Sequence, residues 1–321
     1  MYFCRRAVPA IVLIFIFLLQ PALIGWGERG HELVNRSAAL ILPNDMPGFL
    51  KANAEQLAYL GPEPDRWRER TMEPALYDAQ APEHFIDMER VSWMEQYPPT
   101  RHEFITRLYE RRASVAMDKP DDLLPDKVGY QPYVVMEIYG RLKVAFREYR
   151  RLQAAKRPTA PAEANAIYYA GWLGHYVADA SNPFHTTIHY DGWIDEKNPN
   201  NYRRPKGIHW EFESQFVSRH LESLKLDPLL KPPVRLADPW QEYLKYLRAS
   251  HADVEKVYQM EKAGAFKEAG TPEGVAYVQS RLAAGAQMLA NMWYTAWLES
   301  EKMPERRPRS SQPATSAPPA Q

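Results

Sequence analysis

The sequence predicts an all-α fold, and three observations support this prediction. Apolar residues recur at the three- and four-residue spacing of a buried helix face through most of the chain. No run alternates convincingly between apolar and polar residues, so a large β-sheet is not expected. Thr271-Pro272-Glu273 opens the last apolar-periodic stretch with an N-cap threonine and a proline at the first helical position. The expected helices cover residues 31–42, 46–60, 101–117, 130–155, 161–180, 209–224, 238–260 and a last stretch from 271 onward.

Prolines and apolar faces set the expected ends and buried sides of these helices. The first helix stops at Pro43, and the helix over residues 161–180 ends before Pro183, because proline cannot continue a helix. The last helix carries an apolar and aromatic face, which we expect to pack in the core rather than to bind a ligand. That face consists of Val278, Leu282, Leu289, Trp293 and Trp297.

Two long segments between the expected helices do not look helical. Residues 63–91 are rich in proline and charge, and residues 186–208 contain Asn198-Pro199-Asn200-Asn201 and Pro205. Loops of this length inside a compact domain are usually functional or disordered. Both segments begin or end beside candidate metal ligands, which favours a functional role.

The composition is that of an ordinary globular protein, and the net charge does not favour a polyanionic or a polycationic partner. The chain has 321 residues, of which 25% are charged and 45% hydrophobic, and its formal net charge is zero. This length allows one large domain or two ordinary ones. A nucleic-acid ligand would need a local basic patch or a metal cluster, because overall charge does not attract a polyanion.

Both ends of the chain differ from its body. Arg5 and Arg6 precede an apolar run over residues 7–24, so residues 1–25 are predicted to be a secretory signal peptide. An uncleaved membrane anchor is the alternative. The Pro/Ser/Ala-rich tail, residues 304–321, is expected to be disordered. We therefore expect one domain over residues 26–303, secreted or periplasmic after cleavage before Trp26.

Residues 175–185 contain the strongest candidate for a metal-binding motif. His175 and Asp179 are four residues apart and share one face of the expected helix. Pro183 ends that helix, and His185 lies just past the break. A helix face followed by a turn can thus present three metal-binding side chains to one cavity.

Further histidines and carboxylates complete this pattern. His209 and Glu213 form a second pair four residues apart, while Asp65 and His84 lie in the first long segment. For a single pair of this kind, a salt bridge on a solvated helix face is the alternative. Imidazole and carboxylate ligands without thiolates suit a catalytic zinc site. The remaining histidines lack such partners: His102, His189, His220 and His251. His189 is close enough in sequence to support a ligand from behind, but a surface position is expected for it.

The start of the expected domain matches a known motif. Trp26-Gly27-Glu28-Arg29-Gly30-His31 resembles the start of the single-strand-specific three-zinc nucleases, whose superfamily also contains the zinc-dependent phospholipases C. The resemblance extends over residues 26 to about 300 and implies an all-helical, exported phosphodiesterase with long active-site loops and three Zn²⁺ ions. It implies a first zinc site formed by Asp65, His84, His175 and Asp179. It implies a second site formed by His185, His209 and Glu213. The implied third site consists of the Trp26 amine and carbonyl, His31 and a bridging Asp179.

The resemblance also assigns roles in hydrolysis of a phosphodiester by a zinc-activated water. Asp65 is the candidate to orient the attacking water. Arg68 completes an Asp-x-x-Arg pattern and could neutralise charge on the phosphoryl oxygens. An ordinary surface arginine is the alternative, and the neighbouring Arg66 and Arg70 make the assignment ambiguous.

Substrate features point in two directions. The five-residue step from Trp26 to His31 is the nuclease spacing, and Arg66 replaces a tyrosine that helps to hold choline in the phospholipases. Glu213 and Tyr176 instead resemble the phospholipase branch. Phe85 and Asp87 match nuclease positions that stack on a base and hydrogen-bond its edge.

We therefore expect an endonuclease that acts on single-stranded DNA or RNA as a monomer, without an obligate protein partner. A phospholipase C that acts on phospholipid headgroup esters is the alternative. A non-catalytic, zinc-stabilised binding protein is an alternative of another class. A substrate rim in the second long segment is also considered, although a solvated loop is slightly favoured there: Trp193, Tyr202, Arg203, Arg204 and Lys206.

Overall fold

The computed structural model describes residues 26–114 and 119–302. Within these ranges every regular element is a helix, and the one β-type pairing is an isolated bridge between Tyr190 and Gly192. The predicted all-α class is therefore confirmed. The predicted signal peptide, residues 1–25, and the predicted tail, residues 304–321, lie outside the described residues.

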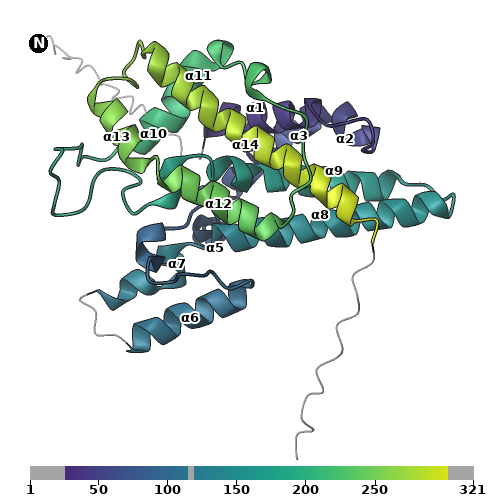
Figure 1. The fold of residues 1–321 in the computed structure, drawn as a ribbon, viewed down its shortest axis with the longest axis horizontal. Helices are drawn as coiled ribbons and strands as arrows, with labels where there is room; N and C mark the ends of the chain where they lie inside the picture. Colours follow the sequence, from purple (N-terminus) through teal and green to yellow (C-terminus); the bar gives the residue numbers. More distant parts are fainter. Residues whose placement is uncertain (1–25, 115–118, 303–321) are drawn as a thin grey trace, which may run out of the picture.

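Five helices form the centre of the molecule: α1 (Gly27–Leu40), α3 (Ala54–Leu60), α8 (Gln131–Ala154), α9 (Ala160–Asp179) and α14 (Pro272–Glu299). α8 and α9 run side by side as a long pair, and α14 crosses them (Figure 1). α9 contacts each of the other four, so its side chains are buried on several sides. A residue near its end is thus held by a large part of the core.

Small residues on α9 let its neighbours approach closely. A Cβ atom added at Gly171 would lie 2.4 Å from the Leu60 Cβ, and one at Gly174 would lie 1.9 Å from the Asn35 Oδ1. The Asn35 Nδ2 donates to the Gly171 carbonyl at 3.0 Å and to the Leu57 carbonyl at 2.8 Å. The two glycines therefore bring α1 and α3 against the part of α9 that precedes its candidate ligands.

The remaining helices cover this centre. They are α2 (Gly48–Ala52), α4 (Glu63–Trp67), α5 (Pro74–Gln80), α6 (Arg101–Ser114), α7 (Pro125–Val128), α10 (Ile208–Trp210), α11 (Phe216–His220), α12 (Pro239–His251) and α13 (Val254–Lys262). Short 3₁₀ turns join several of them, including η1 (Ala81–Glu83) and η4 (Pro183–Thr186), and the π-helical segment η5 (Glu211–Gln215) joins α10 to α11.

The structure corrects several sequence predictions. Residues 63–91, expected to be irregular, contain α4, α5 and 3₁₀ turns, because Pro64 and Pro74 stand in first turns, where proline is tolerated. The helix expected over residues 238–260 breaks between α12 and α13, and that over residues 209–224 is interrupted by η5. Residues 187–207 contain no helix, as expected.

None of the helices in residues 26–114 and 119–302 is long and apolar enough to cross a membrane.

Candidate metal centre

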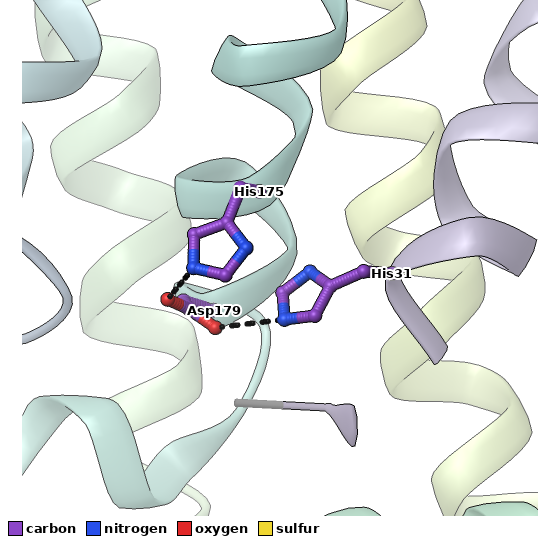
Figure 2. Close-up of side chains that lie close together, drawn as sticks. All are labelled: His31, His175 and Asp179. Atoms are coloured by element: carbon purple, nitrogen blue, oxygen red, sulfur yellow. Dashed lines mark ion pairs between the residues drawn. The ribbon is translucent and has the colours of Figure 1, made fainter. Parts of the chain in front are cut away.

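His175 and Asp179 meet at the end of α9, where both are fully buried. The His175 Nε2 lies 3.2 Å from the Asp179 Oδ2, as the four-residue spacing predicts. His31 approaches from α1, with its Nε2 3.4 Å from the Asp179 Oδ1 (Figure 2). The His175 Nδ1 donates to the Gly61 carbonyl at 2.9 Å. That bond leaves the lone pair of Nε2 directed at Asp179, the arrangement found in metal-ligating histidines.

Asp65 from α4 and His84 from the turn after η1 complete this buried group. The His84 Nδ1 lies 3.0 Å from the His175 Nε2 and 3.2 Å from the Asp179 Oδ2. The Asp65 Oδ1 lies 3.7 Å from His84 Nδ1 and 3.8 Å from His175 Nε2. The structure therefore brings together all four residues of the expected first site.

These distances suit a tetrahedral cation. Ligands about 2.0–2.2 Å from a zinc ion lie about 3.3–3.6 Å from one another, by tetrahedral geometry. The five distances among these four side chains run from 3.0 to 3.8 Å. Several buried atoms of the group also lack a hydrogen-bond partner: both ring nitrogens of His31, both carboxylate oxygens of Asp65, and Asp179 Oδ1. Buried polar atoms are rarely left unpaired, so the donor set fits a bound metal.

His185, His209 and Glu213 form a second group. The Glu213 Oε2 lies 2.7 Å from the His209 Nε2 and 3.4 Å from the His185 Nε2. The His185 Nδ1 donates to the His84 carbonyl at 2.8 Å, which leaves Nε2 free to face Glu213. Asp179 links the groups, because its Oδ2 lies 3.7 Å from the His185 Nδ1. Glu213 lies in the π-helical segment, an irregularity that is frequent at functional sites.

Trp26 is anchored beside the first group. Its fully buried indole donates from Nε1 to the Ala178 carbonyl and to the Ser181 Oγ, each at 2.8 Å. The side chain therefore joins the start of α1 to Ala178, the residue before Asp179. Ligation by its amine and carbonyl stays a prediction.

Side chains from several elements satisfy the carbonyl groups at the end of α9. The Gln131 Nε2 donates to the Tyr176 carbonyl at 2.9 Å, and the Tyr246 hydroxyl donates to that of Val177 at 2.8 Å. Two residues past the helix, the Ser181 carbonyl accepts from the Arg281 Nε at 2.8 Å. The last carbonyls of a helix have no partner within the helix. These bonds allow the helix to end inside the core, where its negative dipole end favours a cation.

Burial and the charges of neighbouring groups together set the pKa values of the first group. Burial lowers the pKa of His31 and holds that of His84 well below its usual range, which favours the neutral imidazole that binds metals. Burial opposes ionisation of Asp179, but the charges of His185 and His175 outweigh it and hold the Asp179 pKa well below its usual range. Burial raises the pKa of Asp65, so this carboxylate depends most on a cation for its ionisation.

A cavity of about 460 Å³ opens onto the second group. His84, His185, His209 and Glu213 line it, whereas His31 and Asp179 do not. The predicted Arg68, Phe85 and Asp87 line its other walls. The second group thus has access to a ligand in the cavity, while much of the first group lies behind it.

The structure resolves the ambiguity among the three arginines. The Arg68 side chain is 16% exposed, lines the cavity, and has its Nη1 3.8 Å from the Asp65 Oδ1. Arg66 instead pairs with Glu63 at 2.8 Å, and Arg70 lies over the Tyr77 ring at 3.9 Å. Arg68 is therefore the arginine beside the candidate ligands, rather than an ordinary surface residue.

Phe85 and Asp87 follow His84 along one wall. The Asp87 Oδ2 accepts from the Arg90 Nε at 2.9 Å, while burial raises the pKa of Asp87 to about 7. Gly129 lies against the Phe85 backbone with φ +75°, and a Cβ there would come within 2.2 Å of the Phe85 carbonyl oxygen. This close approach fixes the wall that carries Phe85.

Sequence reasoning missed several residues of the cavity. Tyr190 lines it with its ring centroid 5.9 Å from that of His209, and Tyr77, Lys127 and Phe184 also line it. Tyr190 lies in the long loop between His185 and His209, but no spacing links it to a ligand. Only its proximity to His185 in the sequence could have suggested it.

The considered substrate rim does not lie at this cavity. Arg203 pairs with Glu211 at 2.7 Å, and Tyr202 is buried against Tyr258 with ring centroids 5.5 Å apart. Two of the other residues also make contacts away from the cavity. Arg204 donates to the carbonyls of Asp195 and Glu196, and Trp193 stacks on His189 with ring centroids 4.0 Å apart. His189, expected on the surface, is 5% exposed, so that prediction was wrong.

Comparisons with known proteins give only distant similarity. No family model matches the chain, and no curated protein matches it. Among solved structures, an alpha-toxin of an avian Clostridium perfringens strain matches with a TM-score of 0.39 and 11% identity, over 86% of this chain and 64% of the toxin. The alpha toxin of Clostridium absonum matches with a TM-score of 0.40 and 12% identity, over 88% and 66%. About a third of each toxin thus lies outside the match.

Proposed function

We propose that this protein is a zinc-dependent hydrolase of phosphodiesters. The observation that supports it is one arrangement: two groups of histidine and carboxylate ligands, several of whose buried atoms lack a hydrogen-bond partner, linked by Asp179 beside a cavity that Arg68 also lines. The first zinc would be held by Asp65, His84, His175 and Asp179, and the second by His185, His209 and Glu213. The third would be held by Trp26, His31 and Asp179.

The residues of the chain have distinct parts in this proposal. Bound zinc ions would supply charge neutralisation and a water of lowered pKa. Asp65 would accept a hydrogen bond from the attacking water, and the lack of other hydrogen-bond partners for both its oxygens supports this role. Arg68 is 3.8 Å from Asp65 and can donate to the phosphoryl oxygens as their negative charge grows.

Charge in the cavity favours a substrate with one phosphodiester group. Its walls carry Arg68, Arg90 and Lys127, and also Asp87, Asp126 and Glu213. Arg90 pairs with Asp87 at 2.9 Å, and Lys127 pairs with Asp126 at 3.4 Å. A polynucleotide is bound by a row of cations along its phosphates, whereas Arg68 is the one basic side chain of these walls outside the two pairs.

The position of Arg66 removes one argument for a nuclease. Its guanidinium pairs with Glu63 and Glu28 and lies 4.3 Å from the Tyr59 ring centroid, and it does not line the cavity. It therefore does not repel a headgroup cation there, whereas Phe85, Tyr77 and Tyr190 offer aromatic surface to one. We accordingly favour a phospholipid headgroup ester as the substrate over single-stranded nucleic acid. The spacing from Trp26 to His31 still supports the nucleic acid.

Export is part of the same proposal. The basic and apolar pattern of residues 1–25 supports secretion or release into a periplasm, with cleavage before Trp26. We further propose that the cleaved protein acts as a monomer. The free amine of Trp26 would exist only after that cleavage and would have to lose its proton to bind zinc.

A side-by-side assay tests the substrate. The zinc-loaded protein, cleaved before Trp26, is incubated with phosphatidylcholine vesicles, single-stranded DNA and single-stranded RNA, with Glu213→Gln as the inactive control. Headgroup release from the vesicles alone is expected. Cleavage of nucleic acid alone would return the assignment to a nuclease. Hydrolysis of none of them by a folded, zinc-containing protein would favour a non-catalytic zinc-stabilised binding protein.

A second experiment tests the terminal amine. One extra residue before Trp26 should weaken the third zinc site and reduce activity, because the amine is then displaced. Zinc content and rate are measured against the protein that begins at Trp26. Unchanged values would exclude the amine as a ligand.

A further inference from the structure

Asn182 lies between the two candidate ligand groups and is fully buried. It follows Asp179 by three residues and precedes His185 by three. Its backbone N–H donates to the Asp179 carbonyl at 2.9 Å, and its own carbonyl accepts from the His185 N–H at 3.0 Å. The backbone of this residue therefore fixes the turn that joins the end of α9 to His185.

The Asn182 side chain makes two further bonds in opposite directions. Its Oδ1 accepts from the Phe184 N–H at 3.0 Å and so caps η4, the turn that carries His185. Its Nδ2 donates to the Glu213 Oε2 at 2.9 Å. Glu213 lies 31 residues further along the chain, in the π-helical segment. One amide thus ties a ligand of one segment to the turn that carries a ligand of another.

The choice of amide explains why both bonds can form together. An asparagine offers an acceptor and a donor at the same time, whereas aspartate offers only acceptors when ionised and serine is too short to reach both partners. The Glu213 Oε2 also lies nearest to His209 and His185, so the donor constrains the oxygen that faces both histidines.

We infer that Asn182 is a positioning residue for the second metal group, which fixes the Glu213 carboxylate relative to His185. The inference rests on the proposed zinc binding and adds a residue that supports a ligand without being one. Partners that orient metal ligands typically change metal affinity about 10- to 100-fold when they are removed.

The test separates the two bonds of the side chain. In Asn182→Ser the hydroxyl can still cap Phe184 but cannot reach Glu213. Zinc content by elemental analysis and the affinity of each zinc in competition with a chromophoric chelator are measured on the zinc-loaded protein. The expected result is an affinity loss of about 10- to 100-fold for one zinc, with the other zinc ions unchanged.

Asn35→Ser is the matched control. Asn35 is equally buried and its side chain also makes two hydrogen bonds, but it donates both from Nδ2 to backbone carbonyls rather than to a ligand. This variant should lower the melting temperature without weakening one zinc selectively. An equal, selective loss in both variants would overturn the inference, because it would then reflect the general cost of removing a buried amide.

A double variant checks that the effect passes through Glu213. When Glu213→Gln has already weakened the second site, adding Asn182→Ser should change the remaining zinc affinities little. If Asn182→Ser does not fold, Asn182→Asp keeps the size and the acceptor for Phe184 but places a like charge against Glu213. The same loss at one zinc is then expected.

The outcomes distinguish this inference from the proposed function. A wild-type protein that binds no zinc would overturn both. A wild-type protein that binds zinc, with titrations of Asn182→Ser and Asn182→Asp that superimpose on its own, would overturn the inference alone.

Discussion

The two ligand groups use the same kinds of residue in different surroundings. In the first group His31, His175 and Asp179 are 0% exposed, whereas the His209 side chain in the second is 12% exposed and lines the cavity. The pair His175 and Asp179 lies on a regular α-helix, while His209 and Glu213 lie across the start of a π-helical segment. Identical spacing therefore gives one pair that is enclosed by the core and one that a ligand can reach.

This difference predicts that the first group retains its metals and that the second group brings a metal into contact with the substrate. Most of the first group lies behind the cavity wall, since only His84 of its members lines the cavity, so its metals are expected to be retained. The second group borders the cavity, so a metal there can contact a substrate atom. Variants in the two groups should differ accordingly in stability, zinc content and activity.

Asp179→Asn should have the largest effect. Asp179 lies within 3.7 Å of a ring nitrogen in each of His31, His84, His175 and His185, so it serves both groups. Loss of more than one zinc, loss of activity and a destabilisation of about 3–5 kcal/mol are expected, since breaking a buried ion pair leaves an uncompensated charge. Elemental analysis and thermal unfolding measure this, with Asp45→Asn as a control. Loss of a single zinc with normal stability would contradict the linking role.

Glu213→Gln should affect the second group alone. One zinc should be lost or weakened, and activity should fall by about 10³-fold, the upper range for removing one electrostatic contact to a transition state. Glu211→Gln, two residues earlier and paired with Arg203, should keep full zinc content. If Glu213→Gln released all zinc ions, the two groups would not be separable.

Arg68→Ala should reduce catalysis without removing zinc. A decrease of about 10²-fold in kcat is expected, because Arg68 lines the cavity and can neutralise charge on the phosphoryl group. Arg70→Ala is the control, since Arg70 lies over Tyr77 and is exposed. Steady-state kinetics and zinc content are compared between the two variants. Equal rates for both would exclude a role for Arg68.

The smallest expected effect concerns Asp87 and pH. Burial raises the pKa of Asp87 from 3.8 to about 7, so the folded state binds more protons than the unfolded state between these values. Its contribution to stability is therefore fully present below about pH 4 and is lost as the pH rises through about 7. As the pH rises from about 5 to about 8, the free energy of unfolding of Asp87→Asn should therefore increase relative to that of wild type by about 1–3 kcal/mol.

Thermal melting curves of both proteins at about pH 5 and about pH 8 measure this difference. Asp126→Asn, an exposed carboxylate on the same cavity wall, serves as the control. A stability difference between Asp87→Asn and wild type that does not change with pH would contradict the expected protonation.

The sequence predicted those parts of the fold and site that depend on local spacing. Periodic apolar faces located the long helices, and the four-residue interval paired His175 with Asp179. The resemblance, rather than any local pattern, brought Asp65, His84 and His31 to the same site. The structure places all three near Asp179, although their chain positions are far apart.

Other features depend on tertiary contacts and could not be predicted. The direction of Arg66 follows from Glu63 and Glu28, and the burial of His189 follows from Trp193. The π-helical segment interrupts a stretch whose apolar spacing fits a plain α-helix. Asn182 carries no motif of its own, because its role appears only once Glu213 lies beside it.

The bonded carbonyl groups at the end of α9 have a consequence for the order of folding. The side chains that satisfy them come from positions as distant as Trp26 and Arg281, and the bond from Trp26 spans 152 residues. Contacts this distant in sequence form late, because long loops must close first. A chain still emerging from the ribosome lacks Arg281 until α14 is being made. Zinc loading should therefore follow the folding of these segments rather than start it.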